Sequence, residues 1–179
     1  MSRGLAQGLG DPPHREARAS VTAVVALGAN LGDRRRTLDE AVDALGRLPL
    51  TEQVVAAAPV ESIAVTLDGP DETAPAYLNS VVRMTTRLAP SVLLGYLHDI
   101  ESRHGRERRV RWGDRTLDLD LIAYGDVVSD DPRLLLPHPR AAERDFVLAP
   151  WLSIDPDAEI PGRGRVDALL AAVRAGGSA

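Results

Sequence analysis

The sequence predicts an α+β sandwich, in which helices pack on a sheet. Two segments carry apolar residues at helical spacing, and short segments with β-branched or alternating apolar and polar residues flank each of them. A pair of strand-like segments separates the two helical ones. Paired strands between helices favour the α+β class over a parallel sheet, in which single strands and helices alternate.

The first strand and the first helix are predicted in residues 21–48. Residues 21–27 are short and rich in valine, which predicts a strand, and residues 28–33 predict a turn because they contain Gly and Asn. Asp33 is placed to cap a helix that runs to about residue 48. The apolar positions at helical spacing in this helix are Leu38, Ala41, Val42 and Leu45.

Two strands and a second helix are predicted in residues 51–105. Residues 51–58 and 77–88 predict the strands, and the second of them alternates well enough for a long strand. Between them, residues 59–76 are polar and contain Gly69, Pro70 and Pro75, so we expect a long mobile loop and a candidate lid. The helix begins near Pro90, since proline suits the first turn, and it ends by Gly105.

The last predicted strand carries two aspartates. Residues 116–121 alternate, with leucines at one parity and Thr116 and the two aspartates at the other, which is typical of a half-buried strand. Residues 134–136 predict a short strand before His138, and residues 165–174 predict a closing helix. The main elements therefore follow the ferredoxin-like β-α-β-β-α-β order, with extra strands and helices, and the aspartate strand is its fourth.

Composition indicates one globular domain, which we expect to span residues 21–179 after a flexible tail of residues 1–20. The chain has 179 residues, of which 44% are hydrophobic, enough to bury a core. The tail lacks the apolar stretch of a signal peptide. No segment approaches the roughly 18 apolar residues of a membrane span.

Charge and residue usage exclude several classes of protein. The net charge is −5 and the pI is about 5.4, which argues against a general nucleic-acid or membrane-surface protein. All 21 basic residues are arginine, so the P-loop motif, which needs a lysine, is impossible. The absence of cysteine excludes disulfides and thiol nucleophiles and fits a reducing cytoplasm.

Asp118 and Asp120 indicate a metal site. Side chains two residues apart on a strand point the same way, about 6.6 Å apart. Adjacent carboxylates repel each other unless a cation lies between them. Mg²⁺ prefers carboxylate oxygens, and a pair of ions can share such ligands, so we expect two Mg²⁺ ions here. The alternative is the solvated polar face of an ordinary strand.

An arginine-rich loop precedes these aspartates. Arginine matches phosphate oxygens in a bidentate way, and metal ions bridge phosphates to carboxylates, so loop and strand together indicate a site for a metal-bound polyphosphate. An ordinary charged surface is the alternative. His138, between two prolines, is suited to act as a fixed ligand or donor, with a surface turn as the alternative. The five loop arginines are Arg106, Arg108, Arg109, Arg111 and Arg115.

Four motifs occur between about residues 21 and 151 in the order in which one known family carries them. By these motifs the chain resembles the 6-hydroxymethyl-7,8-dihydropterin pyrophosphokinases of folate biosynthesis. The third motif is long, which makes the resemblance specific. The motifs are Gly28-x-Asn30-Leu31-Gly32, Tyr77-Leu78-Asn79-Ser80-Val81-Val82, Arg111-Trp112-Gly113-x-Arg115-Thr116-Leu117-Asp118-Leu119-Asp120-Leu121 and Leu136-Pro137-His138-Pro139.

The resemblance implies transfer of the β,γ-pyrophosphoryl group of ATP to the hydroxymethyl oxygen of the pterin, with release of AMP. It implies that Asp118 and Asp120 hold two Mg²⁺ ions and that Arg106 and Arg115 contact the polyphosphate or stabilise the migrating group. It also implies a pterin stacked between Trp112 and Phe146, with Asn79 reading its edge and Tyr77 lining the pocket. The implied ATP-binding residues are His98, Glu101, Arg106, Arg111, Arg115, His138 and Arg144.

The chain departs from the family pattern in three places. Residues 60–64 read Val-Glu-Ser-Ile-Ala where the family has Tyr-x-Thr-x-Pro. The loop between Gly105 and Trp112 is one residue shorter than the pattern, which leaves open whether Arg108 or Arg109 is the second loop arginine. Asp114 stands where proline is common, and none of these changes removes a metal ligand.

Two other functions compete with the enzyme. One is a ferredoxin-like module that binds RNA through the arginine loop, although the acidic pI and the lack of aromatic pairs on a central strand argue against it. The other is a nucleotide or pterin binder without turnover. We expect a cytoplasmic monomer that acts on ATP and the pterin and binds neither nucleic acid nor membrane.

Overall fold

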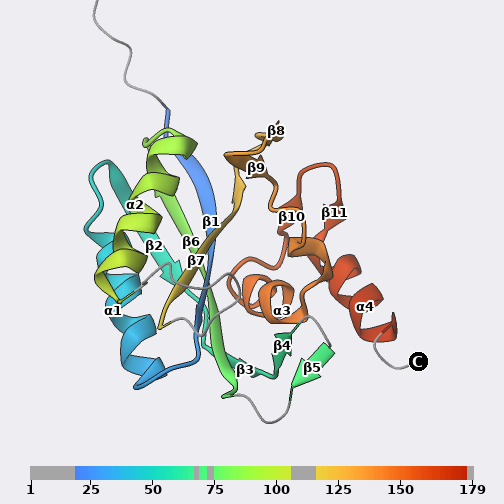
Figure 1. Cartoon of the computed structure of the whole chain (residues 1–179). Coiled ribbons are helices and arrows are strands. Elements are labelled where there is room, and N and C mark those ends of the chain that lie inside the picture. Colours follow the sequence, from blue (N-terminus) through green and yellow to red (C-terminus); the bar gives the residue numbers. More distant parts are fainter. Residues whose placement is uncertain (1–18, 67–68, 72–74, 106–115, 177–179) are drawn as a thin grey trace, which may run out of the picture.

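An antiparallel sheet lies at the centre of the computed structural model, which describes residues 19–66, 69–71, 75–105 and 116–176 (Figure 1). Each pair of neighbouring strands in the sheet is antiparallel. The four long strands, in spatial order, are β2 (Thr51–Ala56), β6 (Tyr77–Thr86), β1 (Val21–Ala29) and β7 (Asp118–Tyr124), and β3 (Val60–Ser62) extends the sheet along β6. The α+β ferredoxin-like prediction is confirmed, with β7 as the fourth strand of the motif and an edge strand.

Helices cover both faces of this sheet (Figure 1). On one face α1 (Arg34–Gly46) and α2 (Pro90–Arg103) enclose a core that contains Leu27, Leu38 and Leu97. On the other face α3 (Asp145–Ile154) and α4 (Val166–Gly176) enclose a second core. The short elements are β4 (Ala64–Thr66), β5 (Gly69–Asp71), β8 (Ser129–Asp131), β9 (Leu134–Leu136), the 3₁₀ turn Ala141–Glu143, β10 (Glu159–Ile160) and β11 (Gly164–Arg165).

The predicted start of α1 is confirmed. Gly32 has a φ of 64°, a left-handed conformation that glycine adopts without strain, and it ends the turn after β1. The Asp33 side chain then accepts a hydrogen bond of 3.1 Å from the backbone N–H of Arg36, which satisfies one of the free donors at the helix start. Gly32 and Asp33 therefore fix the turn between β1 and α1 through local interactions, as the sequence predicts.

The expectation of an irregular loop over residues 59–76 is wrong for three stretches. β3 pairs with the entrance of β6, so that Val60 lies opposite Asn79 and Ser62 lies opposite Tyr77. β4 and β5 form a separate hairpin. Composition missed these strands because edge strands gain their stability from backbone pairing with a distant partner, which a short polar sequence does not reveal. Residues 60–62 are therefore held to β6 by backbone pairing, and the role of this segment as a lid stays a prediction.

β7 places its two aspartates on one face of the sheet. Asp118 and Asp120 lie opposite Gly28 and Ala26 of β1, so the carboxylates share a face, as predicted. Leu119 and the other leucines of the strand point into the core under α1 and α2. The alternation ends at Ile122, where a bulge against β1 shifts the register.

No helix in the described ranges is both long and apolar enough to cross a membrane.

Truncation of Leu97 tests the core beneath α2. Leu97 is fully buried, so Leu97→Ala should lower the free energy of unfolding by about 2 to 5 kcal/mol, because it removes apolar contacts and leaves a cavity. Val92 lies on the same helix and is 48% exposed, so Val92→Ala should change stability by less than about 0.5 kcal/mol. Urea denaturation of both variants measures the difference, and equal losses would contradict this packing.

Candidate active site

The candidate site is built on a row of three residues across neighbouring strands. Asp118 on β7, Gly28 on β1 and Asn79 on β6 lie opposite one another in the ladder and face the same side of the sheet. Because neighbouring strands are about 4.8 Å apart, the two ends of the row are roughly 10 Å apart. Gly28 has no side chain, and the space above it is taken up by the Asn79 and Tyr77 side chains.

His138 and Arg144 approach Asp120 from outside the sheet. The backbone N–H of His138 donates to the carbonyl of Ile122 at 2.8 Å, which fixes the segment after β9 beside β7. His138 Nε2 lies 3.9 Å and Arg144 Nη1 lies 3.5 Å from Asp120 Oδ2. The Asp120 side chain is only 33% exposed and faces a guanidinium, which weighs against a simple solvated face.

His138 is poised as a neutral donor. Burial lowers the pKa of His138 below its ordinary value, Arg144 and Arg140 add to the effect, and Asp120 opposes it. The ring is therefore neutral near pH 7, and its contact with Asp120 is not an ion pair. Nδ1 accepts a hydrogen bond of 3.3 Å from the backbone N–H of Arg140, so the ring proton resides on Nε2, the atom that faces Asp120.

Arg144 and Phe146 form one surface at the start of α3. The Arg144 guanidinium carbon lies 5.6 Å from the centre of the Phe146 ring, within range of a cation–π interaction. Phe146 is half-buried and packs against the second core. The cation of this pair lies beside Asp120, and the expected contact of Phe146 with a pterin stays a prediction.

Asn79 and Tyr77 lie at the entrance of β6. Asn79 is 6% exposed, and its Nδ2 donates to Ser62 Oγ of β3 at 2.8 Å. A Cβ added to Gly28 would lie 3.3 Å from Asn79 Oδ1 and 3.7 Å from Tyr77 Cδ1. Both side chains therefore pack directly over Gly28, and a larger residue there would displace them.

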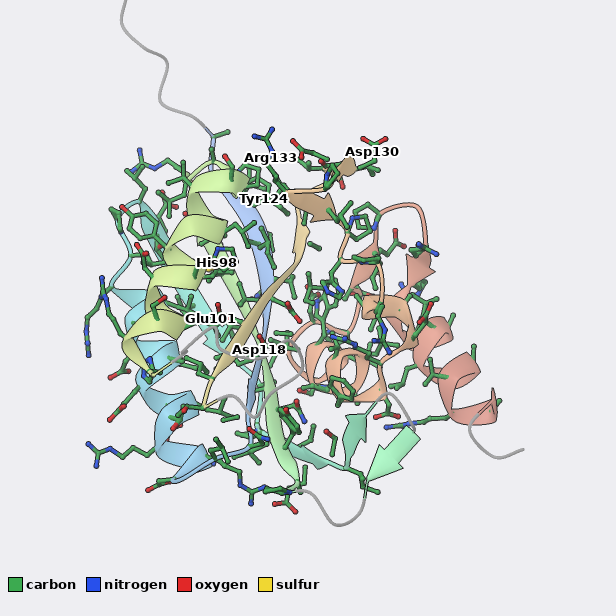
Figure 2. All side chains as sticks on the ribbon, in the orientation of Figure 1. His98, Glu101, Asp118, Tyr124, Asp130 and Arg133 are labelled. Carbon is green, nitrogen blue, oxygen red and sulfur yellow. The ribbon has the colours of Figure 1, made fainter. Side chains whose placement is uncertain are left out.

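Glu101 occupies a different place from the other expected ATP-binding residues. It lies on α2 close to the start of β7 (Figure 2), and it is only 1% exposed. Its Oε1 accepts a hydrogen bond of 2.9 Å from the backbone N–H of Leu119, the residue between the two aspartates. Glu101 thus anchors the edge strand that presents the carboxylates, and its expected contact with ATP stays a prediction.

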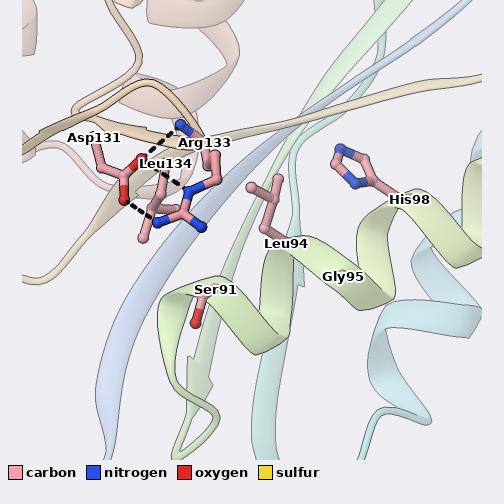
Figure 3. A pocket seen from close by; sticks show the side chains of 7 residues that line it. All are labelled: Ser91, Leu94, Gly95, His98, Asp131, Arg133 and Leu134. Carbon is pink, nitrogen blue, oxygen red and sulfur yellow. Dashed lines mark hydrogen bonds and ion pairs between the residues drawn. The ribbon is translucent and has the colours of Figure 1, made fainter.

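His98 lines a cavity between α2 and the β8–β9 hairpin (Figure 3). The cavity has a volume of about 630 Å³. Arg133, on its rim, donates two side-chain hydrogen bonds to Asp131, and these bonds lower the pKa of Asp131 below its ordinary value. The remaining lining residues are Ser91, Leu94, Gly95 and Leu134. Sequence reasoning missed these residues, because the cavity exists only where the hairpin folds beside α2.

Four expected site residues, Arg106, Arg111, Trp112 and Arg115, lie outside the described residues, as do Arg108 and Arg109. The two described residues that flank them lie together. A Cβ added to Gly105 would be 3.8 Å from Thr116 Oγ1. The chain therefore leaves α2 and returns to β7 at nearly the same point, two residues before Asp118.

The carboxylates offer an incomplete set of metal ligands. Among the described residues, no group of three or more His, Asp or Glu side chains could hold a metal ion. Mg²⁺ commonly takes one or two carboxylates and completes its octahedral shell with water and substrate phosphates. Two partly buried carboxylates on one open face fit that type of site and do not fit a closed structural metal centre.

Comparison with known families and proteins places these features in context. Residues 24–156 match the family model described as 7,8-dihydro-6-hydroxymethylpterin-pyrophosphokinase (HPPK). A 2-amino-4-hydroxy-6-hydroxymethyldihydropteridine pyrophosphokinase of Pseudomonas aeruginosa is 43% identical over 148 residues, which cover 83% of this chain and 89% of that protein. Its namesake in Haemophilus influenzae is 38% identical over 150 residues, covering 84% and 91%.

Solved structures support the same fold. HPPK-DHPS of Plasmodium falciparum, in its wild-type crystal structure with pteroate, superposes with a TM-score of 0.67 at 11% identity. The aligned region covers 88% of this chain and 45% of that one. A triple mutant of the same protein gives a TM-score of 0.63 at 13% identity, with 88% and 45% coverage. This chain thus spans less than half the length of those solved chains.

The Glu101 anchor can be tested without an assay. Glu101→Ala leaves the buried N–H of Leu119 without its acceptor, so we expect a loss of about 1 to 3 kcal/mol in unfolding free energy and faster amide exchange at Leu119. Glu101→Gln keeps Oε1 as an acceptor and should retain most of the protection. Unchanged exchange at Leu119 in the alanine variant would show that the hydrogen bond does not hold the strand.

Proposed function

Because the chain belongs to the 7,8-dihydro-6-hydroxymethylpterin-pyrophosphokinase family, we infer that it transfers the β,γ-pyrophosphoryl group of ATP to 6-hydroxymethyl-7,8-dihydropterin in folate biosynthesis. The hydroxymethyl oxygen bonds to the β-phosphorus and loses its proton. The bond from that phosphorus to the oxygen that bridges it to the α-phosphorus breaks, and AMP leaves. The chain is thus an ATP-dependent pyrophosphokinase, with ATP as co-substrate.

The row from Asp118 to Asn79 is the observation that carries the assignment of the site. A bicyclic heterocycle that pairs with Asn79 on this face of the sheet would direct its substituent toward the carboxylates, roughly 10 Å away. The distance suits a pterin at one end and the β-phosphate at the other. Catalysis then rests on positioning and charge stabilisation, without a covalent intermediate.

Asp118 and Asp120 fit Mg²⁺ through their oxygen ligands and their shared open face. Two ions bound there would neutralise charge on the phosphates and polarise them. Arg144 Nη1 lies 3.5 Å from Asp120 Oδ2, and this contact holds the Asp120 carboxylate in place before a ligand binds. Glu101, through Leu119, fixes the strand that carries both aspartates.

The phosphates of ATP would meet His138 and Arg144 at this end of the site. The His138 Nε2 proton can donate to a phosphate oxygen, because Nδ1 is already occupied as an acceptor. Arg144 offers guanidinium N–H groups within 3.5 Å of the carboxylate that the phosphates would approach. Arg106, Arg111 and Arg115 are proposed to complete the phosphate contacts from the segment that joins α2 to β7.

The nucleoside of ATP is assigned to the cavity between α2 and the β8–β9 hairpin. Its volume of about 630 Å³ suits a small ligand, and Leu94 and Leu134 offer apolar walls to a base. His98 lines this cavity, and Glu101, one turn further along α2, touches β7 beside the aspartates. The helix therefore connects the base to the phosphates.

The pterin is assigned to the other end, between Phe146 and Trp112. Flat heterocycles suit such an aromatic pair. Asn79, held by Ser62, presents an amide that can pair with the pterin edge, and Tyr77 packs beside it over Gly28. The acidic net charge argues against a nucleic-acid or membrane-surface partner, and we propose a cytoplasmic monomer that acts on these two small substrates.

The test of the function is a coupled assay for AMP. AMP should appear only when ATP, Mg²⁺ and 6-hydroxymethyl-7,8-dihydropterin are all present, and EDTA should abolish it. Release of AMP without the pterin, or no release under any condition, would contradict the proposal. Filter binding to RNA distinguishes the competing module, since tight RNA binding by an inactive protein would favour that function.

The aspartates give a sharper prediction. Asp118→Ala and Asp120→Ala should each lower kcat by at least about 100-fold, because each loses a ligand that neutralises phosphate charge. Asp130→Ala is the matched control, since Asp130 is an exposed carboxylate on the β8–β9 hairpin. Activity of the Asp118 or Asp120 variant that equals the control would refute the metal assignment.

His98 tests the nucleoside cavity. His98→Ala removes one wall of the cavity and should raise KM for ATP about three- to tenfold while KM for the pterin stays within about twofold. The control is Asp99→Ala on the exposed side of the same helix. A larger change in the pterin KM than in the ATP KM would show that the two substrates have been assigned to the wrong ends.

A further inference from the structure

Arg34 joins three segments of the chain at the pterin end of the site. It is the first residue of α1, directly after the turn that follows β1. Its Nη1 donates to the carbonyl of Ala76 at 2.6 Å, and its Nη2 donates to Glu61 Oε1 at 3.0 Å. One guanidinium therefore ties the start of α1 to β3 and to the residue that precedes β6.

Both partners of Arg34 are neighbours of residues assigned to the pterin. Ala76 directly precedes Tyr77, and Glu61 directly precedes Ser62, whose hydroxyl accepts from Asn79 Nδ2. Tyr77 and Asn79 in turn lie against Gly28, at the end of the strand that leads to Arg34. The contacts form a closed circuit around the entrance of β6, through β1, α1 and β3.

The two hydrogen bonds of Arg34 contribute unequally to stability. The Glu61 side chain is 65% exposed, and an exposed ion pair contributes little because water screens it. The bond to the Ala76 carbonyl is partly buried and charge-assisted, and the Arg34 side chain is 31% exposed. The hydrogen bond to the Ala76 carbonyl is therefore the stronger of the two interactions. The contact with Glu61 mainly orients Nη2 of the guanidinium.

We propose that Arg34 is a positioning residue for the pterin side of the site, holding β3 and the start of β6 so that Asn79 and Tyr77 meet the substrate. This proposal rests on the proposed function, since it assigns Asn79 and Tyr77 to the pterin. Arg34 does not touch the substrate itself. β3 lies in residues 60–64, where this chain departs from the family pattern, so the circuit fixes a wall that lacks the usual motif.

Arg34→Ala and Arg35→Ala form a matched pair. Arg35 is the next residue of α1 and makes only an exposed pair with Asp39 among the contacts that the structure describes. Arg34→Ala should raise KM for the pterin about five- to twentyfold, with kcat and KM for ATP within about twofold, because positioning is lost at one substrate only. Arg35→Ala should leave all three constants unchanged.

Four further variants test how much each contact of the circuit contributes. Arg34→Lys should be intermediate, because one ammonium cannot span both partners as a guanidinium does. Glu61→Gln should change the pterin KM by less than about threefold, since the exposed pair is the weaker arm. Ser62→Ala should raise the pterin KM, because it removes the acceptor of Asn79 Nδ2. Ser62→Thr keeps the hydroxyl and should leave the pterin KM near the wild-type value.

Amide exchange gives a readout that does not need activity. Arg34→Ala, and not Arg35→Ala, should speed exchange in β3 and at the start of β6 while the exchange of β7 is unchanged. Equal exchange and equal pterin KM in the two variants would overturn the proposal, as would a parallel loss for both substrates. A wild-type enzyme without pterin-dependent AMP release would instead contradict the proposed function, and the exchange result would still decide whether Arg34 holds the wall.

Discussion

The antiparallel pairing of β1 with both β6 and β7 is the constraint on which the site depends. Because β1 lies between them, its register decides which residue of β6 faces which residue of β7. Gly28 falls between Asp118 and Asn79, and its missing side chain leaves room for the Asn79 and Tyr77 side chains to pack over β1. A slip of one residue in either ladder would turn one end of the row toward the opposite core. The site is therefore a property of the sheet as much as of its side chains.

The negative charge at the carboxylate end of the row is balanced from the face of the sheet that α3 covers. Arg144 offsets Asp120 from the start of α3, while burial keeps His138 neutral. Glu101 adds a third carboxylate on the opposite side of β7, where it binds backbone rather than facing the open row. Helices from both faces thus meet at one edge strand. This arrangement explains why a short strand, with only one strand partner in the sheet, can present two carboxylates in a fixed geometry.

Much of this could be read from the sequence, and the parts that could not have a common physical cause. The strict alternation of residues 116–121 predicted the shared face of Asp118 and Asp120, and Asp33 predicted the start of α1. The strands within residues 59–76, the anchoring of Leu119 by Glu101 and the cavity beside His98 were missed. Each depends on contacts between segments far apart in the chain. Local periodicity carries no information about such contacts, whereas motif resemblance supplied residue identities without their geometry.

The ends of the site that are assigned to the two substrates come from different parts of the fold. The cavity assigned to the nucleoside has walls from α2 and the β8–β9 hairpin, whereas the wall at the other end comes from β3 and β6. Substitutions in β3 can therefore accumulate during evolution without disturbing the nucleotide half, provided that the backbone pairing survives. Residues 60–64 of this chain, which depart from the family pattern, lie in and next to β3. For inhibitor design, the affinity of a compound confined to the cavity assigned to the nucleoside would not depend on the residues of β3. A compound that contacts β3 would bind relatives with different β3 residues with different affinities.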